Sequence, residues 1–161
     1  MALSVGSTLP DATFFHMTGD GPQQASTADI FDGKTVVAFA VPGAFTPTCH
    51  MKHMPGFVTH ADAFKAKGVD SIVCLTVNDP FVAGAWSEAT GAGDAVQVIA
   101  DADGSFTKAA GMDFDGSAVG LGVRSLRYAM IVKDGTVSAI NIADSPGEAE
   151  KSSAEALVAA L

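Results

Sequence analysis

Residues 35–49 read TVVAFAVPGAFTPTC, an apolar run that turns toward a polar helix start and ends on a cysteine. The segment Thr35–Val41 is rich in β-branched residues and continuously apolar, which predicts a strand covered on both faces. Thr46 is a good helix N-cap, and Pro47 suits the first helical position because its missing N–H costs nothing there. We therefore expect a buried strand that leads directly into a helix carrying Cys49 in its first turn.

The rest of the chain alternates between strand and helix patterns. The first helix is expected to run from about residue 47 to 67, with a kink at Pro55-Gly56, because proline removes one backbone donor. Asp134-Gly135 separates two apolar runs and is a strong hairpin signal. The other predicted elements are strands at 71–77, 95–100, 127–132 and 136–142 and helices at 81–90, 105–110 and 152–161.

This order of elements predicts a single α/β domain over residues 1–161, with a central mixed β-sheet flanked by helices on both faces. The arrangement resembles the thioredoxin-like fold, with extra strands at the N-terminus and an inserted βα unit. In open sheets of this kind, functional residues gather where strand carboxyl ends meet helix N-termini. Cys49 lies at one such junction.

Composition excludes several classes of function. The chain has 161 residues, 48% of them apolar and 17% charged, which suits one compact core. Eighteen acidic against nine basic residues give a net charge of -9, which argues against a nucleic-acid partner. No apolar run approaches the ~20 residues of a membrane helix. The first residues lack a secretory signal and two cysteines suit a reducing compartment, so we expect a cytoplasmic protein, or a plastid stromal one if a transit peptide has been removed.

The position of Cys49 predicts a reactive thiol. Unpaired backbone N–H groups and the positive end of the helix dipole favour a thiolate in the first turn. A thiolate is the nucleophilic form of cysteine, so the motif indicates nucleophilic chemistry. The alternative is a buried cysteine that serves only to fill the core, as expected for Cys74 in the apolar strand SIVCLTV.

Thiolate chemistry takes several forms, which the neighbouring residues distinguish. No C-x-x-C motif is present, so disulfide exchange through a vicinal dithiol is not expected. His53 shares a helix face with Cys49 and could act as the base of a cysteine hydrolase, whereas His50 faces away. The pair Cys49 and His53 could also bind a metal, but the spacing matches no standard zinc pattern, and we expect no metal and no cofactor.

Several segments together carry a family resemblance. They are PGAFTPTC (42–49), HMPGF (53–57), VNDPF (77–81) with Trp86 nearby, and GLGVRSLRYAM (120–130). The chain resembles a type II peroxiredoxin, of the atypical two-cysteine subfamily and close to its plant and algal members, from about Val5 to Leu161. The resemblance implies a thiol-dependent peroxidase that reduces hydrogen peroxide and alkyl hydroperoxides.

The resemblance also implies roles for individual residues. Cys49 would be the peroxidatic cysteine, which is oxidised to a sulfenic acid, and Thr46 and Arg127 would donate hydrogen bonds around the reacting oxygens. Arg127 is favoured over Arg124 because the family places its arginine directly before the aromatic residue that opens the strand. Pro42 would form a wall of the pocket. The supporting residue His53 would orient the active-site loop; a purely structural histidine is the alternative.

Recycling of the sulfenic acid requires a second thiol. Cys74 matches the family's second cysteine and is a candidate resolving residue, but its apolar strand favours a buried, inert thiol. We therefore expect an external reductant, either glutathione with glutaredoxin or thioredoxin. A homodimer is expected. Core packing is the first expectation for Phe45, Phe81, Leu121 and Trp86, and an apolar rim or a dimer contact is the alternative. A non-enzymatic redox sensor that uses Cys49 as a switch is the alternative function.

Overall fold

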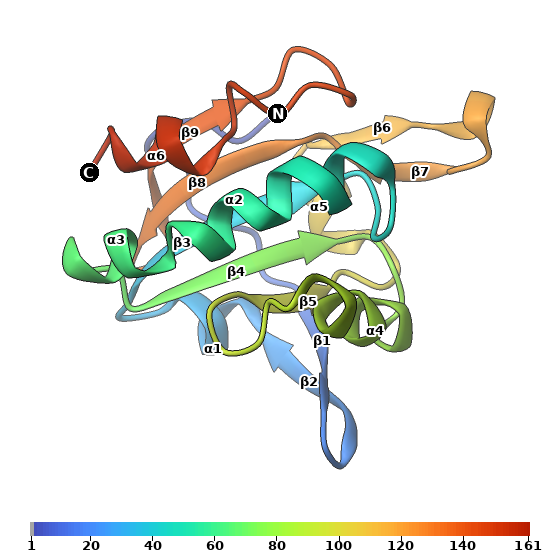
Figure 1. The fold of residues 1–161 in the computed structure, drawn as a ribbon, viewed down its shortest axis with the longest axis horizontal. Coiled ribbons are helices and arrows are strands. Elements are labelled where there is room, and N and C mark those ends of the chain that lie inside the picture. The colour runs from blue at the N-terminus through green and yellow to red at the C-terminus, as the bar shows by residue number, and fades with distance from the viewer. Residues whose placement is uncertain (1) are drawn as a thin grey trace.

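A computed structural model describes residues 2–161 and contains a seven-stranded sheet (Figure 1). Its strands are β1 (Thr13–Thr18), β2 (Gly21–Ser26), β3 (Thr35–Val41), β4 (Ser71–Thr76), β5 (Gln97–Ala100), β8 (Tyr128–Lys133) and β9 (Thr136–Ile142). The spatial order is β2-β1-β5-β4-β3-β8-β9. The central strands β3, β4 and β5 are parallel, while β1, β2, β8 and β9 pair antiparallel with their neighbours. The expected mixed central sheet is therefore confirmed.

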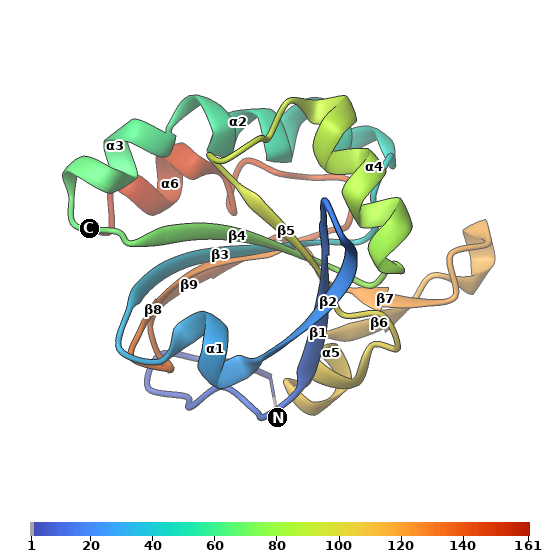
Figure 2. The same cartoon turned by 90° about the horizontal axis from the view of Figure 1, so that it is seen from below.

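Helices cover both faces of this sheet (Figure 2). One face carries α2 (Met54–Thr59), α3 (Ala61–Ala66), α4 (Pro80–Thr90) and α6 (Ala154–Val158), and the other carries α1 (Thr27–Phe31) and α5 (Ser105–Ala109). Strand β3 contributes Val37 and Phe39 to the core on the first face and Val36 and Ala38 to the core on the second. This explains why Thr35–Val41 is apolar without interruption, as predicted for a strand buried on both sides.

The helix that follows β3 differs from the expected one. Residues 47 and 48 are α-helical, but Cys49–His53 form a π-helical turn, η1, in which the Met54 N–H donates to the Cys49 carbonyl. Pro55 lies in the first turn of α2, where its missing N–H is tolerated, and the helix is interrupted later, at His60, between α2 and α3. The prediction of a kink at Pro55-Gly56 is therefore wrong: α2 runs through both residues, and the irregularity is a π turn that ends at His53, two residues before the proline.

Smaller elements also depart from the sequence predictions. The last helix, α6, is shorter than the predicted 152–161, and its N-cap is Ser153, whose Oγ accepts from the Ala156 N–H at 3.2 Å. An arm made of β6 (Asp113–Asp115), the 3-10 turn η2 (Ser117–Val119) and β7 (Val123–Ser125) projects from the body and was not predicted (Figures 1 and 2). The predicted hairpin between β8 and β9 is confirmed, with φ of 48° at Asp134 and 76° at Gly135. Within residues 2–161, no helix is both long and apolar enough to cross a bilayer.

Candidate active site

The candidate site begins where the chain leaves β3 and enters the helix. The His50 N–H donates to the Thr46 carbonyl at 2.9 Å, so Thr46 occupies the N-cap position and Cys49 lies in the first turn. The Thr46 Oγ1 lies 2.8 Å from Cys49 Sγ and 2.7 Å from the Gly43 carbonyl. Because a hydroxyl has one proton, Thr46 donates to only one of these acceptors at a time. The Cys49 side chain itself is fully buried.

A buried guanidinium lies against the same sulfur. Arg127, which directly precedes β8, is 2% exposed and places Nη2 at 3.0 Å from Cys49 Sγ. Arg124 is turned elsewhere: its Nε donates to the Leu121 carbonyl at 2.9 Å and its Nη1 to the Pro42 carbonyl at 3.4 Å. Of the two arginines weighed in the sequence, the structure therefore brings Arg127 to the thiol, while Arg124 braces the loop at the buried Pro42.

The ring nitrogens of His53 are hydrogen-bonded to Arg127 and to the Ser152 carbonyl, and not to the sulfur. Its Nδ1 is 3.0 Å from Arg127 Nη1 and its Nε2 is 2.8 Å from the Ser152 carbonyl. Since a guanidinium only donates, Nδ1 is the acceptor and Nε2 carries the proton. Burial, and then the charge of Arg127, lower the pKa of His53 to about 3. His53 is therefore a neutral ring that accepts from Arg127, and neither of its ring nitrogens is directed at Cys49 as a base.

One backbone carbonyl, that of Pro146, completes the hydrogen bonding of Arg127. The Pro146 carbonyl accepts from Arg127 Nε at 3.1 Å and from Nη2 at 3.0 Å. Sequence reasoning missed this contact because a carbonyl carries no residue-type signature. The sequence did hold one indication of an acceptor near Arg127. A buried guanidinium has five N–H donors that need acceptors, and the turn Ser145-Pro146-Gly147 follows β9, the strand that pairs with β8.

Cys74 lies in the middle of β4, beside Phe39 of β3, and is fully buried. Both cysteines are free thiols in this structure. Burial raises the pKa of the Cys74 thiol well above its ordinary value, the nearby Cys49 raises it further, and Arg127 opposes the effect. These properties agree with the expectation of an unreactive, packed cysteine.

The aromatic residues expected at a rim separate into two groups. Phe45 and Phe81 are exposed, by 51% and 65%, whereas Trp86 is fully buried and belongs to the core. The Trp86 Nε1 donates to His50 Nδ1 at 3.1 Å, and the Phe45 ring stacks on His50 with centroids 5.8 Å apart. Phe45 has a φ of 64°, a conformation that is unusual for a bulky residue. The loop before the helix thus holds an aromatic ring in solvent beside the reactive turn.

A metal site at Cys49 and His53 does not fit the observed contacts. Both ring nitrogens of His53 are engaged, one by Arg127 and the other by Ser152. Across residues 2–161, no group of three or more His, Cys, Asp or Glu side chains is arranged to hold a metal ion.

Comparison with known proteins agrees with this geometry. Residues 4–158 match the Redoxin family. The chain is 44% identical to Peroxiredoxin-2B of Arabidopsis thaliana, over 99% of this chain and 98% of the relative. It is also 44% identical to the chloroplastic Peroxiredoxin-2E of that plant, over 99% of this chain and 70% of the relative. The crystal structure of reduced Prx3 in complex with hydrogen peroxide, from Vibrio vulnificus, has a TM-score of 0.92 and 47% identity, with 98% of both chains covered.

The fold and the family match define the class of protein as a redoxin with a thioredoxin-like core. Within that class the chain belongs to the type II peroxiredoxins, as its motifs predicted. Members of this family are thiol-dependent peroxidases, and the chain is one of them.

Proposed function

We propose that Cys49 reduces hydrogen peroxide and small alkyl hydroperoxides by direct attack of its thiolate on one peroxide oxygen. The oxygen–oxygen bond breaks, the distal oxygen leaves with a proton as water or an alcohol, and Cys49 becomes a sulfenic acid. The observation that carries the proposal is the pair of donors on the sulfur, Arg127 Nη2 at 3.0 Å and Thr46 Oγ1 at 2.8 Å. The Vibrio vulnificus relative, crystallised with hydrogen peroxide, supports this choice of substrate.

Each neighbour has a distinct part in the proposed reaction. The fixed charge of Arg127 stabilises the thiolate and then the negative charge that develops on the departing oxygen. The Thr46 hydroxyl and the Cys49 backbone N–H donate to the peroxide oxygens. Pro42, which is buried, excludes water from the thiolate side of the pocket. His53 keeps Arg127 in place through its neutral ring.

We further propose that an external thiol regenerates the enzyme, with glutathione and glutaredoxin as the first candidates and thioredoxin as the second. The donor thiolate attacks the sulfenic sulfur and releases water, and a second donor thiol then frees Cys49 as the donor is oxidised to a disulfide. Cys74 is a poor candidate for this step because it is buried and its pKa is raised. Cys49 is equally buried, so the first helical turn must open for the donor to reach it.

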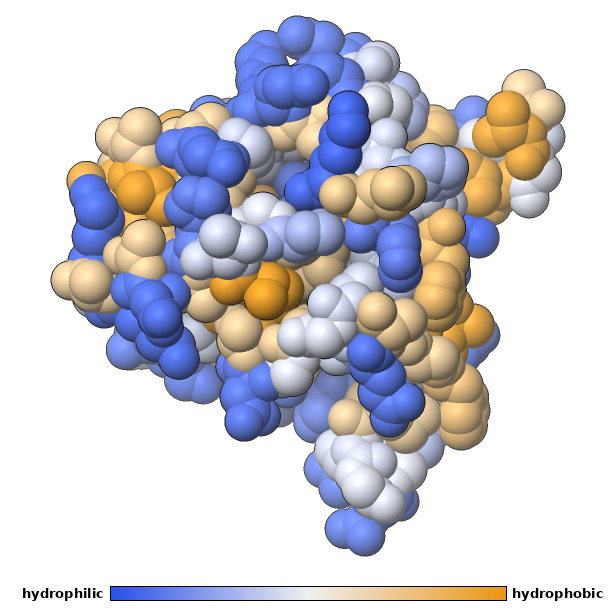
Figure 3. All heavy atoms as spheres, in the orientation of Figure 1, coloured by the Kyte–Doolittle hydropathy of each residue, from blue (hydrophilic) through white to orange (hydrophobic). Residues whose placement is uncertain are grey.

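A homodimer is part of the proposal. Phe45, Phe81, Val119 and Val123 are large apolar side chains left exposed by the fold. Apolar surface gathers along the edge that holds the tip of the β6–β7 arm and the side of α4 (Figure 3). Sedimentation should give a dimer for the wild type and a shift toward monomer for Phe81→Glu, because a buried unpaired charge opposes association. A wild-type monomer at micromolar concentration would contradict the dimer.

The compartment also remains a proposal. We propose the cytoplasm, because two cysteines suit a reducing compartment, with the plastid stroma as the alternative, because one relative is described as chloroplastic. Fractionation of the native host with an antibody against the chain tests this directly.

The peroxidase proposal is tested by stopped-flow reaction with hydrogen peroxide, followed by turnover with glutaredoxin or thioredoxin supplied separately. Cys49→Ser should abolish the reaction, and Arg127→Lys should slow it by about 100-fold, because a preset transition-state donor contributes on that order. Arg124→Lys is the matched control and should have a much smaller effect. A redox sensor would react once and fail to turn over with either donor, and a wild type no faster than a free thiol would refute the proposal.

A further inference from the structure

One loop supplies three backbone carbonyls to the candidate site. It connects β9 to α6 and spans residues 143–153. The Pro146 carbonyl accepts two hydrogen bonds from Arg127, the Gly147 carbonyl accepts from Thr48 Oγ1 at 3.1 Å, and the Ser152 carbonyl lies 2.8 Å from His53 Nε2. The orientation of the guanidinium therefore depends on the conformation of this loop.

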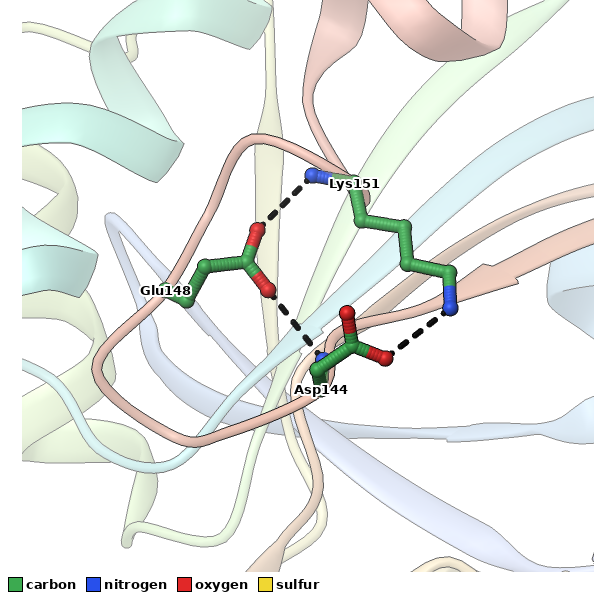
Figure 4. Close-up of polar contacts among 3 residues, drawn as sticks. All are labelled: Asp144, Glu148 and Lys151. Carbon is green, nitrogen blue, oxygen red and sulfur yellow. Dashed lines mark hydrogen bonds and ion pairs between the residues drawn. The ribbon is translucent and has the colours of Figure 1, made fainter.

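The loop is closed on itself by three charged residues on its outer side (Figure 4). The Glu148 carboxylate accepts from the Asp144 N–H at 3.1 Å and from the Lys151 N–H at 3.0 Å. The Lys151 Nζ also reaches back to the Asp144 carboxylate at 3.0 Å. We call this set, Asp144, Glu148 and Lys151, the loop clasp. Pro146 lies within the ring that the clasp closes.

Glu148 is the central member of the loop clasp. Its carboxylate bonds to backbone groups at both ends of the loop, four residues before it and three residues after it. The Lys151–Asp144 pair joins two exposed side chains, and water and salt weaken such a pair. The backbone N–H of Lys151, and then that of Asp144, also lower the pKa of the Glu148 carboxyl, which keeps it ionised and accepting near neutral pH.

We propose that Glu148 is a positioning residue for the peroxidase reaction: it fixes the loop 143–153 so that the Pro146 carbonyl holds Arg127 against Cys49 Sγ. The inference rests on the proposed function and adds to it a residue that lies outside the reactive pocket. Two of the Arg127 N–H groups go to Pro146 and one goes to the sulfur, so movement of the loop redirects the group that contacts the reacting atoms.

Two substitutions of Glu148 separate its acceptor role from its size. Glu148→Ala removes both acceptors, while Glu148→Gln retains a single acceptor oxygen in a side chain of the same length. Glu88→Gln is the matched control, because Glu88 is an exposed glutamate on α4 and its substitution changes the net charge equally. The rate constant for hydrogen peroxide in a single turnover should fall about tenfold in Glu148→Ala, less in Glu148→Gln, and not in Glu88→Gln. A misplacement of about 1 Å can cost about 100-fold, and Glu148 acts on Arg127 only through the loop.

Repeating the Glu148→Ala substitution in the Arg127→Lys variant distinguishes a positioning role of Glu148 from a general loss of stability. With Arg127→Lys, the guanidinium that the loop holds is gone, so adding Glu148→Ala should cause no further loss of rate. The same fold loss in both backgrounds, or equal rates for wild type and Glu148→Ala, would overturn the role of Glu148. A wild type that fails to react faster than a free thiol would instead overturn the peroxidase proposal, so the two failures are distinguishable.

Discussion

Acid should destabilise this fold through one buried side chain, His53. Its pKa is lowered to about 3 from an ordinary 6.5, by burial and by Arg127, so between these values the unfolded chain binds a proton that the folded chain excludes. The neutral His53 therefore leaves the free energy of unfolding at its full value above pH 6.5, the ordinary pKa. That free energy falls progressively as the pH drops from about 6.5 toward about 3. At about pH 5 the loss is about 2 kcal/mol, from roughly 1.5 pH units at about 1.4 kcal/mol per unit. The loss at this pH is set by how far the pH lies below the ordinary pKa of histidine. It hardly depends on the pKa of His53 in the folded protein, as long as that pKa is well below the pH.

Urea unfolding of wild type and His53→Gln, at neutral pH and at about pH 5, measures this loss. The glutamine amide can accept from Arg127 and donate to the Ser152 carbonyl, but it does not titrate. All other titratable groups are common to the two proteins, so the wild type should lose about 2 kcal/mol more than the variant on acidification. Equal losses in the two proteins would refute the assignment of His53 as a buried neutral ring.

Three further predictions concern the core. Cys74→Ala should retain the peroxide rate within about twofold and cost about 1 kcal/mol of stability, because the thiol is only packed; a collapse of the stopped-flow rate would show that Cys74 takes part in the chemistry. Gly84→Ala should cost about 1–3 kcal/mol, because an added Cβ would lie 2.8 Å from Met17 Cβ; an unchanged melting temperature would contradict this contact. Asp101→Ala should cost about 3 kcal/mol or more in urea unfolding, because the buried carboxylate accepts from both the N–H and the hydroxyl of Thr107, at 2.8 and 2.7 Å; a loss under about 1 kcal/mol would argue against that role.

The central strand of the fold was predictable because burial on both faces requires an uninterrupted run of apolar residues. Strand β3 has its predicted bounds, Thr35–Val41, since a strand covered on both faces is apolar throughout. The hairpin at Asp134-Gly135 was predictable because few residues adopt a positive φ at both turn positions. The β6–β7 arm was not, because its strands of three residues are too short to show an alternating pattern.

The candidate site was predictable to a different degree for side chains and for backbone. Thr46 and Arg127, which the family resemblance singled out, both lie within hydrogen-bond distance of Cys49 Sγ, and their roles in the reaction stay predictions. The helix bearing Cys49 was expected to be regular up to Pro55, and no pattern in the sequence indicated a π turn, since the buried positions 49, 53 and 57 also suit an ordinary helix. The role of the Pro146 carbonyl depends on tertiary placement alone, which local sequence does not encode.

The π turn η1 makes chain length itself a part of this reactive centre. Because Met54 N–H bonds to the carbonyl of Cys49, the turn holds one residue more than an α-helical turn. That surplus lets His53 and Met54, adjacent in sequence, both face inward, one toward Arg127 and the other into the apolar core. Deleting a single residue from the turn would close it into an α-helical turn, which would leave the thiol on the same side as Phe57 but would leave only one inward position for the two that His53 and Met54 now fill. Relatives that share these contacts should therefore have the same number of residues between the cysteine and the position of Phe57, even where the residues themselves differ.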